Sequence, residues 1–280
     1  MTITAPPTTT PPPGRPSAAR PIPTEIRSAR HDLGAVPTTL KSDWIKLSTI
    51  RANKVMLALT IAINAFAAWA VATWVKDEAL TISEVFVYPA LLTAVLAAVM
   101  SILMFTSEAQ HGTLATTMTA QPGRWVIAAS KVLTSIGIGL VLGAAGMAAA
   151  ATGAAAGGLP LGDTAAGGVT ALYALLFITL AALTGLGVGM IARHSAAAIS
   201  GLLVWWFVGE NLILAFAPAT VSRFMPGDAG YRMLGVGSDF DTPEILAAAL
   251  PRPSLALLFT AYAIACCAAG TALLYRRDTM

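Results

Sequence analysis

The stretch that decides the fold is residues 169–192, which read VTALYALLFITLAALTGLGVGMIA and contain no charged side chain. The hydrocarbon core of a bilayer is about 30 Å thick, so a helix crosses it with roughly 20 mostly apolar residues. A helix also closes its own backbone hydrogen bonds, which lipid requires. Residues 169–192 therefore predict a membrane-spanning helix.

Five further stretches have the same character. The six expected spans are Val55–Val75, Val85–Thr106, Trp125–Ala148, Val169–Ala192, Ala196–Ala217 and Ser254–Tyr275. Composition agrees, because 56% of the 280 residues are hydrophobic and 11% are charged, whereas soluble domains carry about 25% charged residues. The sequence predicts an all-α membrane protein with a six-helix transmembrane domain over residues 55–280.

Lysine and arginine are unevenly divided between the two sides of these spans. With both termini in the cytoplasm, thirteen fall inside and four outside, the four being Lys76, Arg223, Arg232 and Arg252. An excess inside is the established determinant of topology. We therefore expect cytoplasmic N- and C-termini, and we assign the net charge of +3 to membrane sidedness and not to nucleic-acid binding.

The first 54 residues divide into two parts. Residues 1–23 are rich in Pro, Thr and Ala and lack the apolar core of a signal peptide, so we expect a disordered cytoplasmic tail over residues 1–37. Residues 38–54 place Leu40, Trp44 and Leu47 at helical spacing, with charged residues in other directions. This pattern predicts an amphipathic helix lying in the membrane interface. The alternative is a plain cytoplasmic extension of the first span.

The connection between the second and third spans reads SEAQHGTLATTMTAQPGR, residues 107–124. It is not hydrophobic enough to cross a membrane, and it has few helix breakers before its end. Ser107 suits a helix N-cap and Glu108 suits a first turn, while Pro122 and Gly123 supply a stop. We expect a short helix along the cytoplasmic face.

Glu210 is the one acidic residue well inside an expected span. Because an ionisable group is costly at that depth, it is a functional candidate, and with Asn211 and Asn64 it forms a possible substrate pathway. Glu210 would contact a polar or cationic substrate or relay protons. The alternatives are a bend near Gly209 that leaves Glu210 at the outer interface, or a structural hydrogen bond to Asn64 or Thr60.

No enzymatic site is apparent. His31, His111 and His194 are scattered, and the sequence has neither an HExxH motif nor a nucleotide-binding GxxxxGK[ST] loop. Cys266 and Cys267 are adjacent on one span, which favours a packing role over a disulfide or a metal site. We therefore expect no catalytic residue, no metal and no cofactor in this chain.

The segment Glu108-Ala-Gln-His-Gly-Thr113, followed by Pro122 and Lys131, resembles bacterial type-2 ATP-binding-cassette (ABC) exporter permeases, as do the six spans and the interfacial helix. Many such permeases have a basic residue after the glutamate, and here Gln110 or His111 stands in its place. The resemblance covers nearly all of residues 38–275.

The resemblance implies a role for this segment. In that family it forms a cytoplasmic coupling helix against the ATPase, so Glu108, His111, Gly112 and Thr113 are expected at or near that contact. The interfacial helix would be a second contact. The alternative is structural, with Glu108 capping its own helix and Gly112 permitting close packing.

The resemblance also implies partners and a location. A separate cytoplasmic ATPase subunit would hydrolyse ATP, and a second permease chain, either a copy or a sister, would complete the pathway in membrane lipid. The location would be the bacterial plasma membrane and the activity export of an amphipathic, lipid-like or drug-like substrate from the cytoplasm or inner leaflet. A membrane anchor or regulatory subunit outside the ABC class, or a secondary transporter, remains the alternative. A membrane enzyme is disfavoured.

Overall fold

The computed structural model describes residues 29–75, 80–114, 124–235 and 243–277, and the regular elements in these ranges are helices. They are α1 (Ala29–Thr49), α2 (Arg51–Trp74), α3 (Ile82–Val85), α4 (Ala90–Gln110), α6 (Arg124–Ala156), α7 (Thr164–Ala192), α8 (Ser195–Val204), the π-helix η1 (Trp205–Gly209), α9 (Glu210–Phe216), α10 (Ala219–Ser222), α11 (Pro226–Met233), α12 (Pro243–Ala248) and α13 (Arg252–Arg277).

Six helical segments are long and apolar enough to cross a membrane. They are Arg51–Trp74, Ile82–Gln110, Trp125–Ala156, Thr164–Ala192, Ser195–Phe216 and Arg252–Arg276. Each contains most of one span expected from the sequence. The predicted all-α architecture with six helices long and apolar enough to cross a membrane is therefore confirmed.

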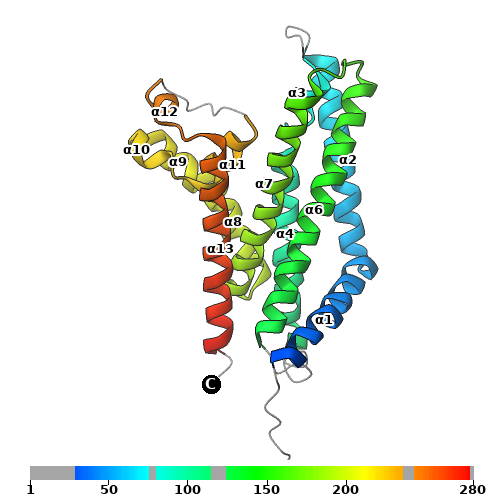
Figure 1. Ribbon diagram of the computed structural model, residues 1–280, viewed down its shortest axis with the longest axis vertical. Coiled ribbons are helices and arrows are strands. Elements are labelled where there is room, and N and C mark those ends of the chain that lie inside the picture. Colours follow the sequence, from blue (N-terminus) through cyan, green and yellow to red (C-terminus); the bar gives the residue numbers. More distant parts are fainter. Residues whose placement is uncertain (1–28, 76–79, 115–123, 236–242, 278–280) are drawn as a thin grey trace, which may run out of the picture.

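Helix α7 lies at the centre of the bundle. It packs against α4, α6 and α13, and α2 packs on the far side of α6. Figure 1 shows α1 and the end of α13 at the lower end of the molecule and the short helices α10 to α12 at the upper end. Because α2, the α8–α9 segment and α13 are largely exposed, their apolar outer faces are available to lipid or to another chain.

Glycines set the spacing between the central helices. A Cβ atom at Gly139 would overlap the Thr179 backbone, and one at Gly185 would overlap the backbone of Ala98. Small residues allow such close approach, which matters because lipid supplies no hydrophobic drive between helices. Gly139 of α6 and Gly185 of α7 thus serve packing inside one chain.

Two boundaries differ from the sequence-based expectation. Helix α1 begins at Ala29, nine residues before the start expected at Thr38, and continues through Pro37. The composition that indicated disorder is confined to residues 1–23. The expected tail over residues 1–37 stays a prediction, because most of it lies outside the described residues.

The second difference concerns the end of the second span. Helix α4 continues to Gln110, so Ser107 and Glu108 lie in its last turn and do not start a new helix. The break comes at Gly112, whose φ of +72° is the left-handed conformation that commonly ends a helix. Thr113 and Leu114 are helical again, but most of the expected short inner helix lies outside the described residues.

Candidate functional site

Lys131 lies in the second turn of α6 and is 2% exposed. Its Nζ is 2.9 Å from Asp43 Oδ1 of α1 and 2.9 Å from Glu108 Oε1 of α4. Lys46, one turn after Asp43, places its own Nζ 3.0 Å from Glu108 Oε1. Asp43, Lys46, Glu108 and Lys131 form what we call the ion cluster. It joins three helices at the lower end of the bundle.

The ion cluster is balanced in charge. Two carboxylates face two ammonium groups, and Ser130 donates a further hydrogen bond of 2.6 Å to Asp43 Oδ2. Burying a charge is costly unless it is paired and hydrogen-bonded, and removing one partner leaves the other exposed to that cost. The cluster therefore holds α1, α4 and α6 in one arrangement.

The end of α4 presents an exposed surface beside the ion cluster. His111, Gly112 and Thr113 are exposed, whereas Glu108 is 8% exposed and faces inward. His111 Nδ1 lies 2.7 Å from the Ser107 carbonyl oxygen. Of the four expected coupling residues, three thus lie on the surface and Glu108 lies behind them, in the cluster.

A hydrogen bond links this end of α4 to the next inner connection. Ser195, the first residue of α8, donates to Gln110 Oε1 at 3.1 Å. His194 caps α8, with its Nδ1 accepting from the Ala197 N–H at 3.4 Å. The connection between α7 and α8 therefore lies against the α4 end.

Glu210 is buried, at 2% exposure, where η1 passes into α9. Its Oε2 accepts hydrogen bonds from the backbone N–H groups of Gly227 at 2.6 Å and Asp228 at 3.3 Å. These N–H groups belong to the first turn of α11, where the helix dipole favours a negative charge. Glu210 therefore connects α11 to the fifth span through these hydrogen bonds. The helix passes from π geometry to α geometry at Glu210.

Asn64 belongs to a different junction. It is 1% exposed in α2, and its Nδ2 donates to Thr93 Oγ1 of α4 at 2.8 Å and to the Thr60 carbonyl at 2.8 Å. Asn211 is half-buried and donates to the Phe207 carbonyl within its own segment, at 2.9 Å.

The three expected pathway residues do not meet. Figure 1 places α2 and α9 on opposite sides of the molecule, which separates Asn64 from Glu210 and Asn211. The hydrogen bonds of Glu210 described above go to α11, so neither Asn64 nor Thr60 is its partner there.

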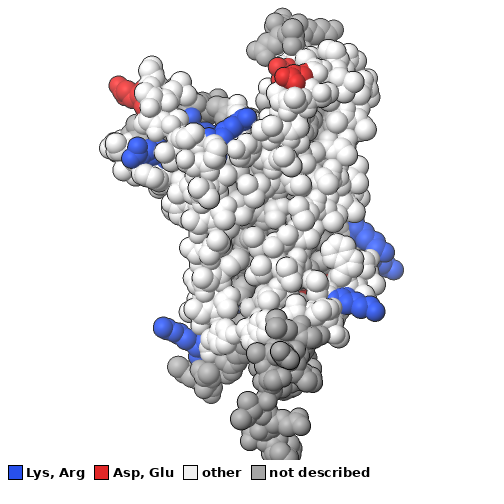
Figure 2. All heavy atoms as spheres, viewed as in Figure 1, with Lys and Arg blue, Asp and Glu red and all other residues white. Residues whose placement is uncertain are grey.

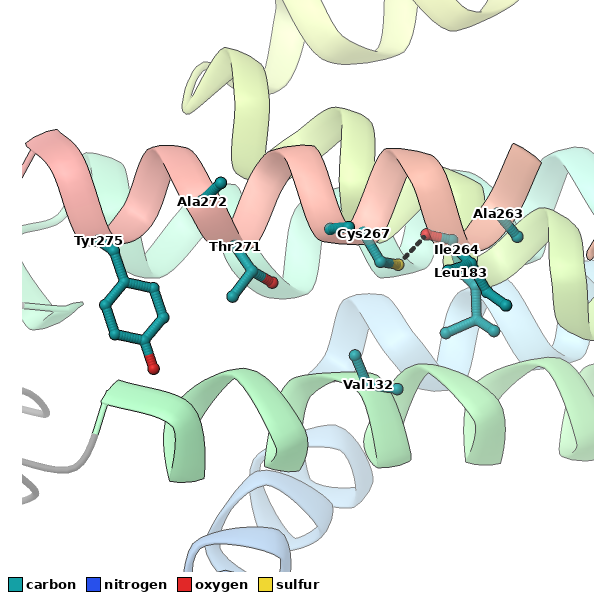
Figure 3. A pocket seen from close by; sticks show the side chains of 9 residues that line it. Val132, Leu183, Ala263, Ile264, Cys267, Thr271, Ala272 and Tyr275 are labelled. Carbon is teal, nitrogen blue, oxygen red and sulfur yellow. Dashed lines mark hydrogen bonds between the residues drawn. The ribbon is translucent and has the colours of Figure 1, made fainter. Parts of the chain in front are cut away.

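An apolar groove of about 540 Å³ opens between α6 and α13. Figure 3 shows Thr271 and Tyr275 pointing from α13 toward α6, which contributes Val132. Cys267 donates its S–H to the Leu183 carbonyl of α7 at 3.2 Å. The groove has apolar walls with a few hydroxyl and thiol groups, which is a surface suited to an amphipathic molecule.

The sequence-based prediction did not include all residues of the ion cluster. Lys131 and Glu108 were identified in one motif, but Asp43 was assigned to the polar face of an amphipathic helix. The available signal was Lys131 itself, because a lysine inside an apolar helix needs a counter-charge. Among the described residues, no group of three or more His, Cys, Asp or Glu side chains is arranged to hold a metal ion.

Comparison with known proteins gives no family: no protein-family model matches the chain, and no curated protein matches it.

Proposed function

We propose that this chain is the transmembrane permease subunit of an ATP-driven exporter of the ABC type. The observation that carries the proposal is the ion cluster, which fastens α1, α4 and α6 directly behind the exposed residues His111 and Thr113. A soluble partner that pushes on this surface would move three helices together, because separating them would leave buried charges unpaired.

The distribution of charge supports a cytoplasmic position for the lower end. Figure 2 shows Lys and Arg side chains at the lower end of the face in view, and both basic and acidic side chains at its upper end. An excess of Lys and Arg marks the cytoplasmic side of a membrane protein. The proposed location is the bacterial plasma membrane, with the ATPase bound to the lower end.

The groove between α6 and α13 supports an amphipathic cargo. It opens in the same half of the bundle as Lys131 and the end of α13, which the proposal assigns to the cytoplasmic half. A lipid-like or drug-like molecule would enter it from the inner leaflet. A second permease chain, a copy or a sister, would pack on the exposed apolar faces of α2 or the α8–α9 segment and complete the pathway.

The hydrogen bonds of Glu210 support a structural role. Its side chain accepts from backbone N–H groups of α11, an arrangement that holds α11 against the fifth span. We therefore assign Glu210 to the attachment of α11.

The test is purification of the tagged full-length chain in a gentle detergent from its native host, with identification of the proteins that accompany it. We expect a soluble ATPase with Walker motifs in stoichiometric amount. His111→Glu combined with Thr113→Glu should remove it, because two carboxylates are added to the contact surface.

Arg276→Glu is the matched control, since it changes charge at an exposed position of the same end on α13. It should leave the ATPase bound. A chain that purifies without any ATPase would overturn the proposal and favour an anchor, a regulatory subunit or a secondary transporter.

A further inference from the structure

A second cavity, of about 320 Å³, lies in the elbow where α1 turns into α2. Its inner wall consists of Met100 of α4 and of Ile138 and Leu142 of α6, none more than 9% exposed. Trp44 and Val141 form part of its rim and are 48% and 43% exposed. The cavity therefore extends from the surface of the bundle into its apolar interior.

The rim of this elbow cavity carries a positive charge. Lys54 lines the cavity and is exposed. Within the described part of the chain no carboxylate forms an ion pair with it. Ser48 and Asn53 add polar groups next to Lys54.

The surroundings of Lys54 are also cationic. Lys41 and Arg51 are exposed, and the one acidic residue among the described side chains of α1 and α2 is Asp43, which is buried against Lys131. Figure 2 shows basic and no acidic side chains over the junction of α1 and α2 in the face it presents. An anionic group at the rim is therefore favoured over a neutral or cationic one.

The position of the cavity identifies the kind of ligand. It lies where a membrane-crossing helix meets a helix with exposed apolar side chains such as Trp44 and Ile45, the region that a bilayer's headgroups occupy. Basic groups next to spans attract anionic lipid, at about 1 kcal/mol for each Lys or Arg. An apolar cavity with a cationic rim at this depth fits a lipid chain and its phosphate.

We infer that the elbow cavity binds an anionic membrane phospholipid, with one acyl chain between α1, α2 and α6 and the headgroup phosphate against Lys54. This site does not depend on an ATPase partner or on an exported cargo.

The test uses Trp44, because its ring lines the cavity. The full chain is placed in phosphatidylcholine nanodiscs that contain a small fraction of phosphatidylglycerol with brominated acyl chains, which quench tryptophan on contact. The Trp44 signal is the difference between wild-type protein and Trp44→Phe. We expect brominated phosphatidylglycerol to quench it saturably, and at lower fractions than brominated phosphatidylcholine.

Two pairs of variants make the test specific. Lys54→Gln should weaken the apparent phosphatidylglycerol affinity about fivefold, the factor equivalent to about 1 kcal/mol, while Arg51→Gln, which removes a charge outside the cavity, should change it less than twofold. Val141→Phe should reduce the quenching by filling the rim, while Val55→Phe, on an exposed face of α2 outside the cavity, should leave it unchanged.

Equal quenching by the two lipids would show ordinary contact with surrounding lipid and would overturn the inference. Equal effects of Lys54→Gln and Arg51→Gln would do the same, because the attraction would then belong to the surface as a whole. If Lys54→Gln does not fold, the comparison of Val141→Phe with Val55→Phe still tests whether the lipid occupies the elbow cavity.

Discussion

At the scale of single residues, Lys131 is the most constrained side chain of the lower end. It is buried and lies 2.9 Å from each of two carboxylates contributed by other helices. Its partner Asp43 is 88 residues away in sequence, so helical periodicity around either residue alone gave no sign of the pair. The sequence indicated a polar face on α1, and the fold uses one residue of that face as a buried counter-ion.

Removing the lysine charge should destabilise the protein strongly. Lys131→Met leaves Asp43 and Glu108 sharing Lys46, which is itself half exposed, so we expect a loss of about 3 to 5 kcal/mol in the free energy of unfolding. Thermal and denaturant unfolding of the purified chain in detergent measures this loss.

The double variant Lys131→Met, Asp43→Asn tests whether the loss comes from charge imbalance. It restores the balance, because Lys46 then pairs with Glu108 alone, so it should recover part of the stability lost in Lys131→Met. Strictly additive losses from the two substitutions would contradict the description of the cluster as one coupled unit.

At the scale of elements, the fifth span shows what could and could not be predicted. Its apolar run predicted a crossing helix, and the segment Ser195–Phe216 is a helical segment long and apolar enough to cross a membrane. The π-helix from Trp205 to Gly209 sets the direction of Glu210, and a π-helix has no clear signal in sequence. The hydrogen-bond partners of Glu210 are backbone N–H groups of α11. Every residue type except proline carries such a group, so the sequence does not indicate which ones Glu210 binds.

Gly227 is the residue on which this attachment depends. A Cβ atom there would overlap the Glu210 carboxylate, so Gly227→Ala should displace that carboxylate from the α11 N–H groups and cost about 1 to 3 kcal/mol of stability. The measurement is the unfolding midpoint of the variant in detergent.

Gly168→Ala is the matched control, because nothing lies within 4 Å of a Cβ at that helical position. It should be neutral or slightly stabilising, since alanine favours a helix over glycine. If Gly227→Ala is as well tolerated as Gly168→Ala, the attachment of α11 through Glu210 is wrong.

At the scale of the whole molecule, the number of spans and their approximate ends were predictable because apolar length alone determines them. The end of α4 was not, since Glu108 continues that helix and contacts Lys131 of α6, a residue in another helix. The three expected pathway residues were grouped by polarity, and the fold assigns them to separate junctions. A polar side chain inside a span indicates that it needs a hydrogen-bonding or charged partner, but it does not indicate which residue that partner is.

We propose that the exposed end of α4 contacts a soluble ATPase. The direct measurement is photocrosslinking in native cells, with a benzoylphenylalanine residue at position 111 or 113 in one set and at Tyr88 in another. Tyr88 is 48% exposed in the turn before α4, at the opposite end of that helix. We predict an adduct with an ATPase that carries Walker motifs from positions 111 and 113 and none from position 88. Absence of that adduct at both inner positions, or its formation at position 88, would contradict the account.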